Sequence, residues 1–312
     1  MVRNFAIWCL ALVVLLLFFW WGRLSPVASL LVISLSPLPV YLVGRRLGNL
    51  AALFLVLAVS LLIFSLKPGL AMVVDYLGFG ELLLMGFMLS SLESRGWTPD
   101  RAIILTVLGL TFISLLFLAG QGIISGLTPD EIFSRKAGEI MEMLSGVLSG
   151  AGETPSELKV LGISLEEIRT LIQSLLPSLV VTNTGLMAWI NVVLARQLMS
   201  LLGWVKPEPP LYYWSTPEWF IFPVLAAGFL LLVPVPLLRL VSMNLLVILG
   251  LLYFCQGVAV VAAWFQRFRL PLFLRCIGYP LMFLHPLFLL VITLGLMDIW
   301  LDFRRLHQPL DA

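Results

Sequence analysis

The chain has 312 residues, of which 61% are hydrophobic and 12% are charged, and its mean hydropathy is +1.06. A soluble domain is about 45–50% apolar and about 25% charged, so this composition is that of a multi-span membrane protein. The net charge is only +2 and the basic residues are scattered singly or in pairs. This argues against nucleic acid as a partner, because a phosphate-binding face needs clustered Lys and Arg.

The first predicted element is an apolar run from Phe5 to Trp21, which follows Arg3. It is long for the apolar region of a signal peptide, which spans about 7–15 residues. It also ends in Trp20-Trp21-Gly22-Arg23, without a small-x-small cleavage pattern. Tryptophan side chains favour the membrane–water interface. We therefore predict a retained first span.

Further apolar segments continue along the chain, and a bilayer-spanning helix needs about 20 such residues. Nine segments qualify and predict an all-α, polytopic transmembrane helix bundle: 5–21, 25–43, 47–66, 69–91, 102–120, 177–199, 218–238, 240–264 and 277–299. The seventh holds Pro223, Pro234 and Pro236, and we interpret it as a kinked span because neighbouring helices can satisfy the carbonyls that a proline frees. Eight spans is the alternative.

The short loops carry an asymmetric charge. With nine spans, ten Lys and Arg residues fall on the N-terminal side and five on the other, leaving aside four in the long segment 121–176. Because the basic side of short loops faces the cytoplasm, this predicts a cytoplasmic N-terminus, with 121–176 outside. Arg304 and Arg305 at the C-terminus would prefer the cytoplasm, which eight spans would allow.

Residues 121–176 are the only sizeable extramembrane segment, and they hold eight of the seventeen acidic residues. Three capping boxes, in which a hydroxyl and a later Glu satisfy each other's backbone amides, begin at Thr128, Thr154 and Ser164. Apolar residues then recur at helical spacing, so we expect amphipathic helices that lie on the membrane or cover the mouth of the bundle. The chain thus divides into an N-terminal bundle of five spans (1–120), this acidic connector (121–176) and a C-terminal bundle of four spans (177–312).

Motifs of enzymes are mostly absent: the sequence has no HExxH, Gly-x-Ser-x-Gly, P-loop or Cys-x-x-Cys. Its three cysteines are far apart in apolar segments, which suggests neither a disulfide framework nor a zinc site. Gly78-Phe79-Gly80-Glu81 faintly resembles the Gly-x-Gly-Asp site of intramembrane aspartyl proteases. Those enzymes need a second acid from a facing helix, whereas Asp75 is on the same helix, about 120° round. We expect no enzyme activity, no metal and no cofactor.

Seven polar side chains remain inside the predicted spans as candidate ligand-binding residues: Glu81 and Asp75 on the fourth, Asn183 and Asn191 on the sixth, Asn244 and Gln256 on the eighth, and His285 on the ninth. An ionised carboxylate at the depth of Glu81 costs at least ~2.5 kcal/mol. One hypothesis is that these groups converge on a polar pocket or proton path. The other is interhelical bonding, worth about 0.6 kcal/mol per hydrogen bond.

The positions of four of these residues within their predicted spans give further expectations. Asp75 lies near one end of its span, where it can reach interfacial water. Asn183 and Asn191 are about 80° apart round their helix, so they can share a face. His285 is flanked by Pro280 and Pro286, which suggests a broken helix.

The last predicted span ends in a charged pattern. Asp298, Asp302 and Arg305 fall on one helical face, which predicts a structural clamp with Trp300 as its interfacial anchor.

Several stretches carry a family resemblance: Gly295 to Arg305, Gln256-Gly257-Val258-Ala259, Pro37-Leu38-Pro39 with Arg45-Arg46-Leu47-Gly48, and Pro217-Glu218-Trp219. They resemble the YybS-like bacterial membrane proteins, a family of unknown function. That family is distantly similar to the substrate-binding subunits of energy-coupling-factor vitamin transporters and to the cell-shape protein MreD, so the resemblance implies transport or scaffolding. The acidic insert 121–176 goes beyond a compact six-span subunit.

Together these observations predict a multi-pass protein of the bacterial cytoplasmic (inner) membrane. We expect it to transport or bind a small solute in a pocket lined by Glu81 and the amides, in contact with the lipid bilayer and with other membrane subunits. The alternative is a non-catalytic scaffold or regulator of envelope assembly that acts through partner helices. A cavity lined by Glu81 and open to one aqueous side would favour the first.

Overall fold

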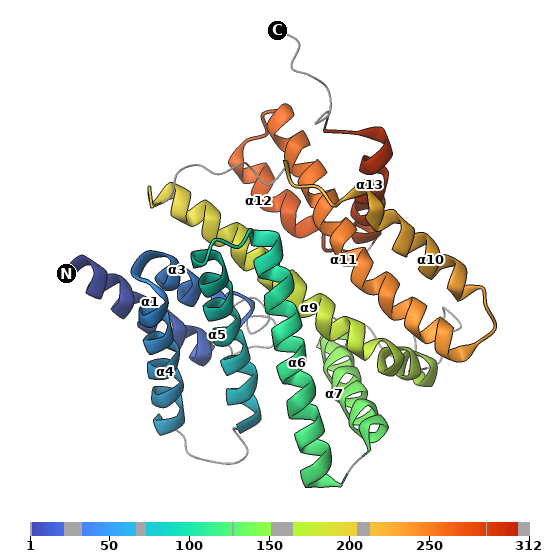
Figure 1. The fold of residues 1–312 in the computed structure, drawn as a ribbon, viewed down its shortest axis with the longest axis horizontal. Helices are drawn as coiled ribbons and strands as arrows, with labels where there is room; N and C mark the ends of the chain where they lie inside the picture. Colours follow the sequence, from blue (N-terminus) through green and yellow to red (C-terminus); the bar gives the residue numbers. More distant parts are fainter. Residues whose placement is uncertain are drawn as a thin grey trace. The chain divides into compact units, whose positions relative to one another are not determined.

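The computed structural model describes residues 2–21, 33–66, 73–126, 128–150, 165–204, 213–284 and 286–304. These residues form helices and no strand (Figure 1), so the predicted all-α class is confirmed. In chain order the helices are α1 (Val2–Trp21), α3 (Pro37–Leu47), α4 (Asn49–Leu66), α5 (Val73–Ser94), α6 (Pro99–Ser125), α7 (Pro129–Gly150), α9 (Leu165–Leu201), the 3₁₀ helix η4 (Glu218–Phe220), α10 (Ile221–Leu231), α11 (Pro236–Arg267), α12 (Leu272–Leu281) and α13 (Leu287–Leu301).

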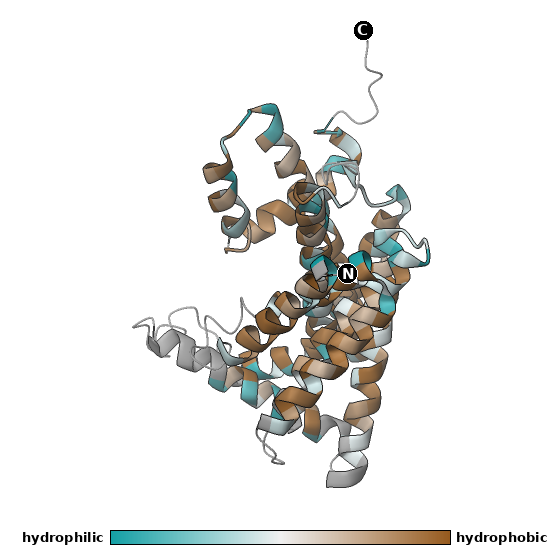
Figure 2. Ribbon diagram, turned by 90° about the vertical axis from the view of Figure 1, so that its left-hand side faces the viewer, coloured by the Kyte–Doolittle hydropathy of each residue, from teal (hydrophilic) through white to brown (hydrophobic). Residues whose placement is uncertain are grey.

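Several of these helices suit a membrane by length and composition. Four have long apolar stretches that can cross a bilayer: Arg3–Trp21, Pro99–Gly120, Glu167–Leu201 and Pro236–Arg267. Shorter apolar helices cover Asn49–Ser65, Glu218–Leu231, Leu272–Leu281 and Leu287–Leu301. Figure 2 shows the brown colour of apolar residues along much of the length of the helices. Exposed residues such as Phe112 and Phe229 are large and apolar, as expected where lipid replaces water around a helix.

The chain forms two compact units. Unit 1 contains Met1–Ile113 and Asn183–Glu208, and unit 2 contains Ser114–Thr182 and Pro209–Ala312. Helices α6 and α9 each contribute one part to each unit.

Unit 1 is organised around the close approach of α3 and α5. A Cβ added at Gly44 would collide with the side chain of Ser90, and one added at Gly86 would collide with the carbonyl of Pro37. Glycine at these two positions lets the two backbones come together, as small residues do between membrane helices. The paired residue numbers rise together, so α3 and α5 run parallel.

Unit 2 is organised around α11, against which α13 packs at close range. A Cβ added at Gly257 would collide with the carbonyl of Val291, and one added at Gly295 would collide with the carbonyl of Tyr253. Phe254 contacts Phe288 and Trp264 contacts Phe303. The numbers of these two pairs rise together, so the chain of α13 runs parallel to α11.

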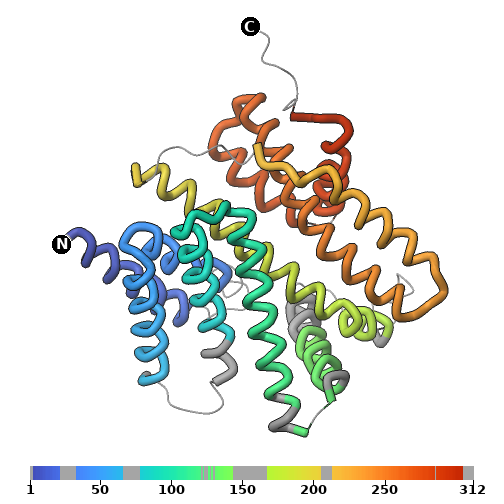
Figure 3. The backbone as a smooth tube through the Cα atoms, in the orientation of Figure 1, coloured from blue at the N-terminus to red at the C-terminus, as the bar shows by residue number. Residues whose placement is uncertain are grey.

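Helix α12 runs in the opposite direction. Phe265 contacts Tyr279 and Phe254 contacts Phe283, so α12 is antiparallel to α11. The backbone therefore turns after α11, descends along it as α12 and returns as α13 (Figure 3). The predicted span 277–299 is divided between α12 and α13, and the break predicted between Pro280 and Pro286 is confirmed by the end of α12 at Leu281 and the start of α13 at Leu287.

Two boundary predictions are wrong. The kinked span 218–238 does not exist as one helix, since α10 ends at Leu231 and Pro236 opens α11. Proline is favoured in the first turn because its missing N–H has no partner there in any helix. The predicted span 69–91 leaves Glu93 in the loop that follows it, but α5 continues to Ser94 and the Glu93 side chain is buried.

The first predicted capping box is confirmed at the start of α7. The Thr128 backbone amide and hydroxyl donate to Glu131 Oε2 at 2.6 and 2.9 Å, and the Glu131 amide donates to Thr128 Oγ1 at 3.4 Å. These bonds hold the pKa of Glu131 below its usual range. The capping boxes at Thr154 and Ser164 begin outside the described residues.

Candidate functional site

Asn244 on α11 bonds to the backbone of α9 beside Pro177. Its Oδ1 accepts a hydrogen bond from the Ser178 amide at 3.1 Å, and its Nδ2 donates to the Ser174 carbonyl at 2.9 Å. In a regular helix the amide and carbonyl four residues apart bond to each other. The Asn244 side chain thus bridges the two ends of one helical hydrogen bond next to a proline. Within unit 2 this amide fastens α11 to α9.

Gln256 belongs to a second, more deeply buried network in unit 2. Its Nε2 donates to Asp298 Oδ2 at 3.2 Å. Its Oε1 accepts hydrogen bonds from the backbone amide and the hydroxyl of Thr216. Gln256 is 1% exposed, so the bonds made by its amide replace those it would make to water. The residue joins α11, α13 and the segment before η4.

Arg304 completes this network. Its Nε and Nη2 lie 2.9 and 2.5 Å from Asp298 Oδ2, and its Nη1 donates to the Trp214 carbonyl at 2.5 Å. The chain reaches this position because Asp302 adopts a positive φ of 40° after α13. The clamp predicted at this end therefore exists, but the described partner of Asp298 is Arg304. Arg305 lies outside the described residues.

The two candidate asparagines of unit 1 differ in their surroundings. Asn191 is fully buried, and its Nδ2 donates to the carbonyls of Ser34 and Met187 at 2.8 and 2.7 Å. Asn183 is exposed, and its Nδ2 lies 3.9 Å from Met187 Sδ. Asn191 thus links α9 to the chain segment before α3, whereas Asn183 faces the outside of unit 1.

Glu93 forms a charged cluster that our sequence analysis did not identify. Tyr41 donates a 2.6 Å hydrogen bond to Glu93 Oε2. Arg45 Nε lies 3.6 Å from the same oxygen, and Arg196 Nη2 lies 3.9 Å from Oε1. The carboxylate is buried, with two guanidinium groups and a phenol around it. The cluster connects the ends of α3, α5 and α9.

The remaining candidates are less fully described. Glu81 is half-buried, nine residues into α5. The side chain of Asp75 and the whole of His285 lie outside the described residues. Asn244 and Gln256 are twelve residues apart on α11, which corresponds to about 18 Å. These two amides therefore serve different contacts rather than one compact pocket.

Unit 1 has a hollow between α4 and α5 close to Glu81. It has a volume of about 400 Å³, and its lining is mainly apolar: Leu57, Ser60, Leu61, Ile63, Phe64, Phe79 and Gly80. Glu81 follows the lining residue Gly80 but is not part of the lining. This hollow suits an apolar group better than a polar solute.

Unit 2 has a larger hollow between the start of α9 and the α10–α11 turn. It has a volume of about 620 Å³ and is lined by Glu167, Thr170, Leu171, Ser174, Pro234, Pro236, Arg239, Leu240 and Met243. Both signs of charge and two hydroxyl groups therefore meet at one opening. Among the predicted site residues whose side chains the structure describes, none lines it.

Comparison with known families supports the membrane assignment. A family described as predicted membrane protein (DUF2232) matches residues 11–299. The chain belongs to this family. Its members are membrane proteins of unknown function, which agrees with the predicted resemblance to an uncharacterised family. No curated protein and no solved structure matches the chain.

The polar residues that the sequence analysis overlooked share one property. Glu93, Arg45, Arg196 and Arg304 lie at helix ends, where charges are expected to meet interfacial water. Only contacts between helices reveal that Glu93 is buried. The sequence signal that could have drawn attention to Glu93 was that acidic residues are rare among the arginines of the N-terminal loops.

Proposed function

We propose that the protein binds a small polar solute in the bacterial inner membrane, as a non-enzymatic transport or solute-binding protein. The observation that carries this proposal is the hollow of unit 2, where Glu167 and Arg239 line the same space. A carboxylate attracts an amino group and a guanidinium attracts a carboxylate. The lining therefore favours a small zwitterionic solute.

The dimensions of this hollow support the proposal. Its volume of about 620 Å³ falls within the range of about 300–1,000 Å³ that is typical of small-molecule sites. Helix α11 has 32 residues and is about 48 Å long, whereas the hydrocarbon core is about 30 Å thick. Its first turn, which contains Arg239, then lies near the headgroups, where a solute can enter from water.

The test begins with the ligand. The protein is purified from native membranes in nanodiscs, bound small molecules are identified by mass spectrometry, and their affinity is measured by calorimetry. We expect Glu167→Gln and Arg239→Gln each to weaken binding by about tenfold or more, because each removes a charge-assisted hydrogen bond worth about 1.5–3 kcal/mol. Arg135→Gln on α7, an exposed site in the same unit, is the matched control. Unchanged affinity in both hollow variants would refute this site.

A second candidate function is a membrane scaffold, and a different observation favours it. Asn191, Asn244 and Gln256 all bond between chain segments rather than lining a hollow. Such bonds fix the arrangement of helices that a partner protein would recognise. In that case native purification should recover a stoichiometric partner protein, and Arg239→Gln should leave the cellular phenotype intact.

A further inference from the structure

One end of unit 1 gathers arginine residues from separate parts of the chain. The Trp8 indole donates to the Ala51 carbonyl at 3.0 Å, which places the start of α1 beside the start of α4. The Asn49 side chain bonds to Ser94 at the end of α5. The arginines at this end are Arg3, Arg45, Arg46, Arg95, Arg101 and Arg196.

The acidic residues of the same segments are too few to balance this charge. Glu93 and Asp100 are the two carboxylates that these described helix ends carry. Glu93 is buried and is shared between Arg45 and Arg196, whose side chains remain 22% and 29% exposed. Arg3, Arg95 and Arg101 are exposed. The end of unit 1 is therefore strongly positive and accessible.

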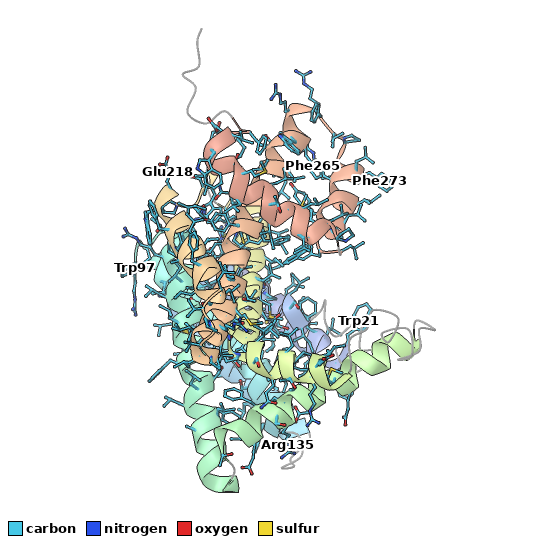
Figure 4. The ribbon with its side chains drawn as sticks, turned by 90° about the vertical axis from the view of Figure 1, so that its right-hand side faces the viewer. Trp21, Trp97, Arg135, Glu218, Phe265 and Phe273 are labelled. Atoms are coloured by element: carbon cyan, nitrogen blue, oxygen red, sulfur yellow. The ribbon has the colours of Figure 1, made fainter. Side chains whose placement is uncertain are left out.

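Tryptophan side chains accompany these arginines. The Arg46 guanidinium lies 5.3 Å from the centroid of the Trp204 ring. Trp97 is 44% exposed and projects outward in Figure 4. Tryptophan is enriched at the level of the lipid headgroups, so this rim of arginine and tryptophan is placed at a membrane surface rather than in bulk water.

We propose that this arginine–tryptophan rim binds the headgroup phosphate of anionic phospholipids. Clustered basic residues beside membrane helices attract anionic lipids of the cytoplasmic leaflet. A guanidinium also binds phosphate oxygens through two parallel hydrogen bonds. The Glu93 cluster holds the ends of α3, α5 and α9 together. The helix ends that carry the exposed arginines therefore keep fixed positions relative to one another. The proposal is independent of the solute hollow in unit 2.

The experiment uses the full-length protein in nanodiscs that contain equal amounts of phosphatidylglycerol and phosphatidylcholine. Native mass spectrometry measures which lipid stays bound. We expect phosphatidylglycerol to be retained preferentially. The double variant Arg46→Gln/Arg95→Gln should reduce this preference by about fivefold for each arginine removed, which corresponds to about 1 kcal/mol per charge. Neither residue contacts Glu93 in the described ion pairs, so the cluster beneath them is preserved.

Two comparisons make the result decisive. Arg135→Gln removes the same charge from α7, where the Arg135 side chain is 73% exposed, and should leave the lipid preference unchanged. Equal retention of the two lipids by the native protein would overturn the proposal, as would an unchanged preference in the double variant. Displacement of bound lipid by millimolar inorganic phosphate would also overturn it, because the rim would then be a site for the free anion.

Discussion

Asn244 Oδ1 accepts a 3.1 Å hydrogen bond from the backbone amide of Ser178, the residue that follows Pro177 in α9. The Asn244 Nδ2 donates to the Ser174 carbonyl at 2.9 Å. A proline removes one helical hydrogen bond and crowds the preceding turn, so the helix is weakest at this point. A side chain from α11 supplies bonds there and joins two helices at the same time.

Asn244→Leu should therefore destabilise unit 2. Interhelical hydrogen bonds in membranes contribute about 0.6 kcal/mol each on average, so we expect a loss of about 1–2 kcal/mol in the free energy of unfolding. Equilibrium unfolding in mixed detergent micelles measures this free energy. Asn183→Leu is the control, because Asn183 is exposed and its described contact, with Met187, stays within α9. Equal stability of the two variants would contradict this role for Asn244.

The buried pair Asp298–Arg304 should be intolerant of single changes. Both side chains are almost fully buried, at 3% and 2% exposure, and removing one partner of a buried pair costs about 3–5 kcal/mol. Asp298→Leu and Arg304→Met should each lower the unfolding temperature strongly, whereas the double variant should be more stable than either. The exposed pair Lys136–Glu139 provides the comparison, since such pairs contribute about 0–1 kcal/mol. Additive losses in the double variant would exclude direct coupling.

The parallel course of α11 and α13 predicts that Arg269 and Arg304 face the same side of the membrane. A single full span over 277–299 would place them on opposite sides. In a variant with Cys9, Cys255 and Cys276 replaced by alanine, cysteines at these two positions should react alike with a membrane-impermeant reagent. The charge rule places them in the cytoplasm, so labelling should require cell lysis. A cysteine at Ser149 should instead be labelled in intact cells.

Substitutions at Glu81 can distinguish a functional role of this residue from a structural role. Glu81→Gln keeps the shape of the side chain and removes its charge. If the carboxylate takes part in binding or coupling, this variant should insert and fold but lose activity. If the residue only holds helices together, Glu81→Gln should be silent and Glu81→Leu mildly destabilising. The cellular phenotype at matched expression is the measurement, and normal function of both variants would exclude a functional role for Glu81.

The start of α7 should depend on pH. Because hydrogen bonds from Thr128 lower the pKa of Glu131, the charged carboxylate stabilises the folded helix end above the usual Glu range. This contribution should be lost as the pH falls through the lowered pKa. Titration of the Glu131 carboxyl carbon by NMR should show Thr128→Ala moving the pKa up towards 4.5. An unchanged pKa would mean that the capping box does not form in solution.

The sequence by itself determined the helical class, the membrane environment and several helix ends. Apolar runs of about 20 residues have few alternatives to a helix in lipid, since every backbone group must bond internally. The capping box at Thr128 and the break between Pro280 and Pro286 could be predicted because they depend on neighbouring residues. A structural clamp at Asp298 was also predicted from the sequence. The residue that pairs with Asp298 in the structure is Arg304, which the sequence pattern did not single out.

Tertiary structure alone decided which polar groups meet. Glu93 and Arg45 are 48 residues apart in the sequence, and Gln256 and Asp298 are 42 apart, so no local pattern could pair them. Membrane helices offer a nearly uniform apolar surface, and small residues such as Gly257 and Gly295 set the register between them through backbone contact. The burial of Glu93, the bridge from Asn244 to α9 and the return of α13 alongside α11 all follow from that register.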